Sequence, residues 1–132
     1  MRGAWVMEGE RDSRISLGVD CYLNLNGAVL VKDGETKYLT PIEFRLLRYL
    51  AEHMGEVVSS NELIVRGWGE NTMAQRDELY VFIHQIRVQL EDNPENPTCL
   101  KTVRRRGYIL HPRRKYCSSY TLPPDGIRNA KT

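Results

Sequence analysis

Three consecutive arginines near the end of the sequence, Arg104, Arg105 and Arg106, separate two short apolar, β-prone runs. The following Gly107 supplies a permissive turn residue, so the segment predicts a β-hairpin with the three "tip arginines" at its turn. Guanidinium groups bind phosphate oxygens and enter narrow A·T-rich minor grooves. The tip arginines, together with Thr102, are therefore candidate contacts to a nucleic-acid backbone. The alternative is a solvated hairpin whose charges only protect an exposed strand edge.

Charge is distributed unevenly along the chain. Of its 19 basic and 17 acidic residues, nine basic and one acidic lie in residues 100–132, which gives that segment a net charge of +8. The remaining ten basic and sixteen acidic residues give the rest of the chain a net charge of −6. The electric field of such an uneven charge distribution steers one side of a protein toward a polyanion. A basic tail that only aids solubility would give the same count, so charge alone does not select a function.

An amphipathic helix is predicted just before the hairpin, from about residue 72 to residue 91. Apolar residues recur there at steps of three and four and form the expected core face: Leu79, Phe82, Ile83, Ile86 and Leu90. The candidate DNA contacts on the rest of this helix are Arg76, Asp77, Tyr80, Val81, His84, Gln85 and Arg87. For any one of these residues, an ordinary polar helix surface is the alternative interpretation.

The uncharged candidates on this helix suit particular groups of DNA. Val81 suits thymine methyl groups, and the Gln85 amide suits the paired donor and acceptor of adenine. His84 and Tyr80 would reach phosphates or base edges. Together they predict a surface that reads bases in the major groove.

The charged residues of the same helix have more than one open role. Arg87 would reach a phosphate. Asp77 can accept from cytosine N4, pair with Arg76, or stabilise the helix N-terminus as an acid. With Glu78 and Glu91 counted, acids outnumber arginines by one between residues 76 and 91. An acid facing phosphate is repulsive, so base readout by this helix would be unusual or weak.

The elements that must position these residues come earlier in the chain. Residues 15–39 contain short apolar runs broken by Asn26-Gly27 and Asp33-Gly34, which favour tight hairpins and predict a small antiparallel sheet of three or four strands. Capping-box patterns at residues 40–43 and 59–62 predict the starts of two more helices. A sheet, three helices and a hairpin predict an α+β winged helix-turn-helix fold, with the hairpin as the wing.

One folded domain is expected from 132 residues of ordinary globular composition. Residues 1–14 are predicted to be a flexible lead-in, and residues 15–111 to be the winged-helix DNA-binding domain. Residues 112–132 are predicted to be a basic, disordered tail.

Residues from about 15 to 110 resemble the C-terminal effector domain of OmpR/PhoB-type response regulators. The resemblance rests on the order and spacing of short matches at residues 39–44, 46–47, 58–59, 63–69, 83–90, 96–97, 101–104 and 107–108. It implies a four-stranded N-terminal sheet and a bacterial transcription regulator that binds double-stranded DNA, commonly as a head-to-tail dimer on direct repeats. It also implies that the loop from Gly69 to Met73 is where RNA polymerase would be contacted.

Two features depart from the pattern of that family. Its members usually carry an N-terminal receiver domain, which fourteen polar residues cannot form, so the chain is either an excised effector domain or a stand-alone regulator. Its third helix generally presents Arg-Thr where this chain has Asp77-Glu78, a histidine at Phe82, and often two arginines at His84-Gln85. Base readout is therefore expected to differ from the family norm.

Several other classes of function are disfavoured. Cys21, Cys99 and Cys117 form neither a disulfide framework nor a metal-binding pair, and the histidines are scattered, so the sequence predicts no metal, no cofactor and no enzymatic activity. No export signal or stretch of 18 apolar residues is present, so a cytoplasmic protein without membrane attachment is expected.

Two functions remain open at this point. One is a transcription regulator that binds double-stranded DNA through the third helix and the arginine-rich wing. The other is a winged helix that has become a protein interaction module with weak or no DNA binding. The tip arginines favour the first, and the acids on the third helix favour the second.

Overall fold

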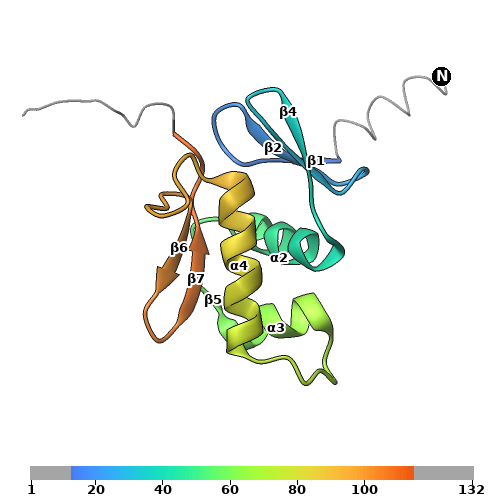
Figure 1. Cartoon of the computed structure of the whole chain (residues 1–132), viewed down its shortest axis with the longest axis vertical. Helices are drawn as coiled ribbons and strands as arrows, with labels where there is room; N and C mark the ends of the chain where they lie inside the picture. The colour runs from blue at the N-terminus through green and yellow to red at the C-terminus, as the bar shows by residue number, and fades with distance from the viewer. Residues whose placement is uncertain (1–12, 115–132) are drawn as a thin grey trace, which may run out of the picture.

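A computed structural model describes residues 13–114, which begin with a four-stranded antiparallel sheet (Figure 1). Its strands are adjacent in sequence order: β1 (Arg14–Ser16), β2 (Cys21–Asn24), β3 (Val29–Lys32) and β4 (Glu35–Tyr38). Between β3 and β4, Asp33 and Gly34 take φ values of 53° and 81°, which aspartate and glycine tolerate in tight hairpins. The predicted sheet is confirmed, with four strands. The predicted lead-in and tail lie outside the described residues except at 13–14 and 112–114.

Three helices follow the sheet: α2 (Pro41–Glu52), α3 (Ser60–Trp68) and α4 (Arg76–Leu90). Thr40 Oγ1 accepts a hydrogen bond from Glu43 N at 3.2 Å, and the Glu43 carboxylate accepts one from Thr40 N at 3.0 Å. The capping box predicted for α2 is therefore present. Ser59 Oγ caps α3 by accepting a hydrogen bond from Glu62 N at 3.1 Å.

Helix α4 begins about four residues later than predicted. Thr72 Oγ1 accepts a hydrogen bond from Ala74 N at 2.9 Å and forms a local turn instead of a helix cap. The helix then starts at Arg76, where Gln75 N donates to Glu78 Oε1 at 2.6 Å. The pattern at residues 72–75 therefore ends a loop and does not open the helix.

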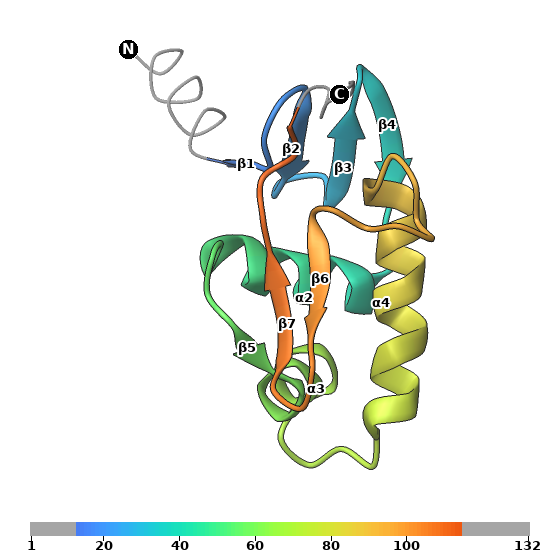
Figure 2. The same ribbon diagram turned by 90° about the vertical axis from the view of Figure 1, so that its left-hand side faces the viewer.

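The second sheet contains the predicted hairpin and one added strand. Its strands are β5 (Val58–Ser59), β6 (Leu100–Val103) and β7 (Gly107–Leu110), in the order β5-β7-β6. Figure 2 shows β6 and β7 side by side, with their turn at the end of the molecule remote from the first sheet. A Cβ atom at Gly107 would lie 1.9 Å from Val58 O, so only glycine lets β7 approach β5 this closely.

The core lies between the three helices and the inner faces of the two sheets. Its fully buried large side chains are Leu17, Leu23, Leu30, Leu46, Leu47, Leu50, Leu63, Leu79, Ile83, Ile86, Leu90 and Leu100. The predicted core stripe of α4 is confirmed at its four aliphatic positions, while Phe82 is half-buried and packs edge-on against Trp68 with ring centroids 5.3 Å apart. Among residues 13–114, no helix is long and apolar enough to cross a membrane.

The chain after the wing returns to the first sheet. Arg113 N donates to Leu17 O at 2.7 Å, Arg113 O accepts from Val19 N at 2.9 Å, and residues 18 and 113 form a parallel bridge. A Cβ atom at Gly18 would lie 2.1 Å from Arg113 N, so a side chain there would prevent the bridge. Arg113 was predicted to belong to the tail, but its contacts join it to the folded domain.

The guanidinium group of Arg113 also joins the first sheet to the end of α4. It pairs with Asp33 and with Asp92, each at 2.8 Å, and donates to Val19 O at 2.9 Å. Lys32 Nζ pairs with Asp92 at 3.3 Å. These four charged residues, Lys32, Asp33, Asp92 and Arg113, form what we call the Arg113 cluster.

Replacing Arg113 with methionine tests this cluster. Because the guanidinium donates to both carboxylates, it holds the pKa of Asp33 and of Asp92 below the ordinary value of 3.8. A lowered folded-state pKa gives stabilisation that is complete above the ordinary pKa and disappears as the pH falls through the lowered one. We expect Arg113→Met to lower the Tm of thermal unfolding by several degrees at neutral pH. The difference in Tm between the wild type and this variant should become smaller below pH 3.8.

The matched control for this prediction is Lys37→Met. Lys37 pairs only with Glu35 of its own strand, at 3.5 Å, so this substitution should leave Tm nearly unchanged across the same pH range. A gap between Arg113→Met and the wild type that stays constant down to the lowest pH would contradict the prediction. It would assign the loss to the hydrogen bond that Arg113 donates to Val19 O, which does not depend on the ionisation of either carboxylate.

Candidate nucleic-acid interface

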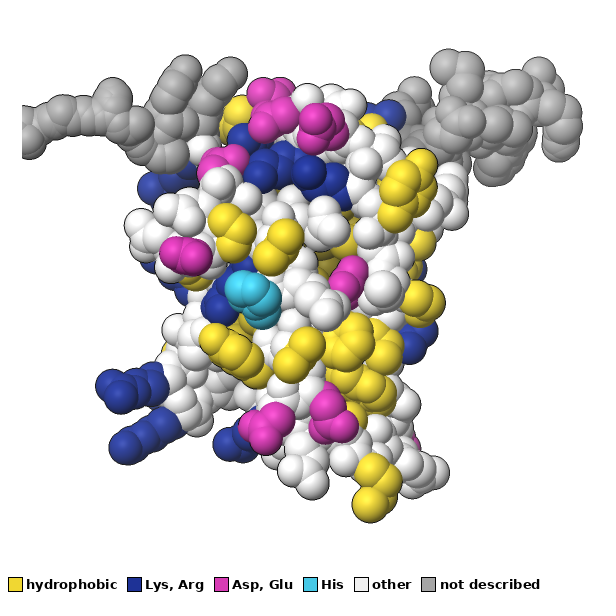
Figure 3. All heavy atoms as spheres, viewed as in Figure 1, with side chains coloured by type: hydrophobic (Ala, Val, Ile, Leu, Met, Phe, Trp, Pro, Cys, Tyr) yellow, Lys and Arg dark blue, Asp and Glu magenta, His cyan; other side chains and the backbone are white. Residues whose placement is uncertain are grey.

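The tip arginines lie on the turn between β6 and β7. Arg106 N donates to Val103 O at 2.9 Å and closes the turn, while Arg105 takes the left-handed φ of 67°. All three side chains are exposed, and no acid among residues 13–114 forms an ion pair with them. Figure 3 shows basic side chains projecting from the molecule on the side where the wing lies in Figure 1. The turn therefore presents three uncompensated positive charges to solvent.

Five predicted contact residues lie together on the exposed face of α4. They are Asp77, Tyr80, Val81, His84 and Gln85, and the exposed Val88 extends the same face by one turn. Hydrophobic side chains and a histidine lie over this helix in Figure 3. This face is continuous along the helix because residues three and four positions apart lie side by side.

A small cleft joins the start of α4 to the wing. Its lining includes Arg76, Thr102, Arg105 and Arg106, which were all predicted contacts, and Ser60 at the first turn of α3. Three guanidinium groups thus surround a cleft at the N-terminal end of a helix, where backbone N–H groups favour anions. The arrangement suits a phosphate that lies between α4 and the wing.

The role predicted for Arg87 is wrong, because this residue is only 7% exposed. Its Nε donates to Leu100 O at 2.9 Å and its Nη2 donates to Thr102 Oγ1 at 2.9 Å. Arg87 is therefore a positioning residue that ties α4 to strand β6. The Thr102 hydroxyl accepts this bond and retains its proton for donation to another group.

Truncation of Arg87 should separate α4 from the wing. Arg87→Met keeps most of the apolar stem but leaves Leu100 O and Thr102 Oγ1 without their donor. We therefore expect the free energy of unfolding to fall by about 1.5–3 kcal/mol. Urea denaturation followed by circular dichroism measures this free energy. Arg76→Met, on the exposed start of the same helix, should change it by less than about 0.5 kcal/mol. Equal effects of the two substitutions would contradict the positioning role.

Two acids in the first turn of α4 are close to the predicted interface. Glu78 accepts the hydrogen bond from Gln75 N, so its carboxylate caps the helix. Asp77 is exposed in the same turn, where the helix N-terminus favours an acid. The acids are thus confined to the first turn and do not extend along the helix face.

Glu91 is a structural residue that the sequence analysis did not single out. It is 3% exposed, and its carboxylate accepts hydrogen bonds from the backbone N–H groups of Thr98, Cys99 and Leu100 at 2.9, 3.0 and 2.7 Å. Lys32 Nζ donates to its carbonyl oxygen at 2.9 Å. Glu91 therefore holds the end of α4, the start of β6 and the first sheet together. The only sequence signal was its place between the apolar stripe and a proline-rich loop.

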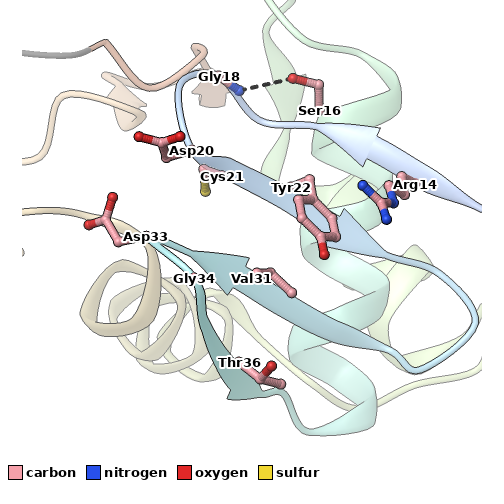
Figure 4. A pocket seen from close by; sticks show the side chains of 10 residues that line it. All are labelled: Arg14, Ser16, Gly18, Asp20, Cys21, Tyr22, Val31, Asp33, Gly34 and Thr36. Carbon is pink, nitrogen blue, oxygen red and sulfur yellow. Dashed lines mark hydrogen bonds between the residues drawn. The ribbon is translucent and has the colours of Figure 1, made fainter.

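A broad hollow on the outer side of the first sheet lies away from this interface (Figure 4). Arg14 lies at one end of it with its guanidinium carbon 4.5 Å from the centre of the Tyr22 ring, and Asp33 lies at the other end, paired with Arg113. Its principal charged groups therefore already have partners in the fold.

The described cysteines are poorly suited to nucleophilic chemistry. Burial raises the pKa of the Cys21 thiol to about 12 and that of the Cys99 thiol to about 11, so both remain protonated at neutral pH. Within residues 13–114, no group of three or more His, Cys, Asp or Glu side chains is arranged to hold a metal ion.

Comparison with known proteins places this fold among transcription regulators. The family described as "Transcriptional regulatory protein, C terminal" matches residues 34–110. The regulatory protein VanRc of Enterococcus gallinarum is 36% identical over 105 residues, which cover 80% of this chain and 42% of that protein. The transcriptional regulatory protein KdpE of Mycobacterium tuberculosis is 36% identical over 86 residues, covering 65% of this chain and 38% of that protein. The chain thus spans about two fifths of the length of these relatives.

Solved structures give the same result. The DNA-binding domain of CpxR from Escherichia coli superposes with a TM-score of 0.62 at 34% identity, covering 74% of this chain and 96% of that domain. The DNA-binding domain of Klebsiella pneumoniae RstA, solved in complex with the RstA box, gives a TM-score of 0.66 at 28% identity. The match covers 76% of this chain and 98% of that domain. The chain therefore belongs to the OmpR/PhoB-type family of winged-helix DNA-binding domains of transcriptional response regulators, a family of non-enzymatic domains.

Proposed function

We propose that this domain binds double-stranded DNA with α4 in the major groove and the wing on the flanking backbone and minor groove. The observation that carries the proposal is the turn of the wing, where three exposed arginines without acidic partners lie beside the cleft that also includes Arg76. A phosphate in this cleft would be held by guanidinium groups from two separate elements. The exposed face of α4 then lies next to the contacted backbone, as base readout requires.

The comparison with RstA supports this arrangement, since that domain was solved with its DNA box and shares this fold over 76% of the present chain. We propose the same class of partner here, with contacts from Arg76, Thr102 and the tip arginines to phosphates. Tyr80, Val81, His84 and Gln85 would face the bases. Arg87 is excluded from the contact set because it is buried.

Selection from a pool of random duplex DNA at two salt concentrations tests the proposal. We expect an enriched sequence whose affinity falls steeply with salt, because each phosphate contact releases counterions and contributes about 0.9 to the slope of log K against log salt. A direct repeat with roughly ten-base-pair spacing would also support binding as a head-to-tail dimer. No retention at low salt would contradict the proposal.

A protein interaction module is the second candidate, favoured by the exposed apolar groups on α4. Val81 and Val88 are each about half exposed, and the only acids nearby are in the first turn. In that case Val81→Glu should abolish partner capture and leave any residual DNA affinity unchanged. If the domain binds DNA through α4, the same substitution should reduce DNA affinity.

We further propose that the loop from Gly69 to Met73 contacts RNA polymerase. Met73 is 89% exposed, which is unusual for a large apolar side chain and leaves it available for a protein partner. Met73→Ser should lower transcription from the selected DNA in vitro and leave DNA affinity unchanged. Equal transcription by both proteins would exclude this role.

A further inference from the structure

The exposed face of α4 carries no charged side chain after its first turn. The only Lys, Arg, Asp or Glu between residues 79 and 90 is Arg87, which is buried. The exposed side chains there are two valines, a tyrosine, a histidine and a glutamine, with Val81 50% and Val88 52% exposed. Whatever this face binds in the major groove must be recognised by apolar contacts and neutral hydrogen bonds.

Base pairs differ in how well such groups recognise them. Guanine presents two acceptors, O6 and N7, which arginine and lysine bind best. Adenine presents an acceptor and a donor that match a carboxamide, and thymine presents a methyl group that suits an apolar side chain. A face with valines and a glutamine but no accessible cation therefore matches A·T pairs better than G·C pairs.

The spacing of the three side chains fits a short run of base pairs. Val81, Gln85 and Val88 lie at positions i, i+4 and i+7 of α4, on one line along the helix. The rise over seven residues is about 10 Å, which corresponds to about three base-pair steps of 3.4 Å.

We infer that α4 recognises an A·T run of about four base pairs, in which Val81 and Val88 contact thymine methyl groups and Gln85 binds adenine through two hydrogen bonds. This inference rests on the proposed function, because it assigns base contacts to the helix placed in the major groove. The tip arginines fit the same kind of site, since narrow minor grooves of A·T tracts attract arginine.

Replacing thymine by deoxyuridine, which lacks only the methyl group, tests the contacts directly. In the selected sequence, we expect the wild-type domain to lose about three- to fivefold in affinity for each contacted methyl removed. The Val81→Ala variant should become insensitive to one of these replacements, and Val88→Ala to another. Val19→Ala serves as the control, because Val19 is an exposed valine in the turn between β1 and β2 and this variant should keep the full sensitivity of the wild type.

Gln85→Arg tests the adenine contact. We expect the preference of this variant to change from adenine to guanine at one position of the selected sequence, with the other positions unchanged. A selected sequence with G·C pairs opposite α4, or equal affinity for thymine and deoxyuridine at every position, would overturn the inference and leave the proposed function intact. Absence of retained DNA at low salt would instead overturn the proposed function itself.

Discussion

Replacement of all three tip arginines with glutamine is expected to weaken binding to duplex DNA on the order of a thousandfold. Each charge-assisted hydrogen bond contributes about 1.5 kcal/mol or more, and three such losses correspond to this change in affinity. The slope of log K against log salt should become shallower by about 0.9 for each phosphate contact removed. Fluorescence anisotropy with a labelled duplex over a range of salt concentrations measures both quantities.

This prediction has a charge-matched control on the first sheet. Arg104→Gln/Arg106→Gln removes two cations from the wing, and Arg14→Gln/Lys37→Gln removes one exposed and one half-buried cation from β1 and β4. Only the wing pair should reduce affinity strongly, because the first sheet lies at the other end of the molecule (Figure 1). Equal losses for both pairs would mean that the total charge drives binding and that the wing is not the anchor. Unchanged Tm values would show that both variants fold.

Glu91→Ala is expected to cause the largest loss of stability among single substitutions at the junction of α4 and the wing. The change removes a buried carboxylate that three backbone N–H groups use as their acceptor, and the N–H groups of Cys99 and Leu100 would then lie buried without a partner. Each buried donor left without an acceptor costs roughly 1–3 kcal/mol, so the two together cost roughly 2–6 kcal/mol. The free energy of unfolding in urea should fall by this amount.

A matched control for that measurement is Glu95→Ala, in the exposed loop that follows α4. This change should alter the free energy of unfolding by less than about 0.5 kcal/mol. The Glu91 variant should also lose DNA affinity at temperatures where it remains folded, since the wing would no longer be held against α4. A loss of stability below about 1 kcal/mol for Glu91→Ala would show that this carboxylate does not hold the junction.

The parts of the fold that depend on local sequence could be predicted. Asp33-Gly34 predicts a hairpin because the required backbone angles are a property of those two residues. Thr40 and Glu43 predict a helix start because both cap partners lie within one turn. The wing could be predicted for the same reason, since Gly107 and the flanking β-prone residues are adjacent in sequence.

The parts of the fold that depend on contacts between distant segments could not be predicted from the sequence. Arg87 lies at the edge of the apolar stripe of α4, where the helix pattern alone does not decide burial, and its bonds to β6 are what bury it. Glu91 and Arg113 find their partners across loops or across the whole domain. The DNA contacts themselves stay predictions.

The bridge between residues 18 and 113 has a consequence for how the domain folds. Val19 and Arg113, which are hydrogen-bonded through their backbones, are 94 positions apart in the chain. Contacts of such long separation require most of the chain to be ordered before they form. We therefore expect the helices and the local hairpins to form first and this closure to be the last step. In the native state the same contact should open most readily, which would appear as early hydrogen exchange at Val19 and Arg113 before the core amides exchange.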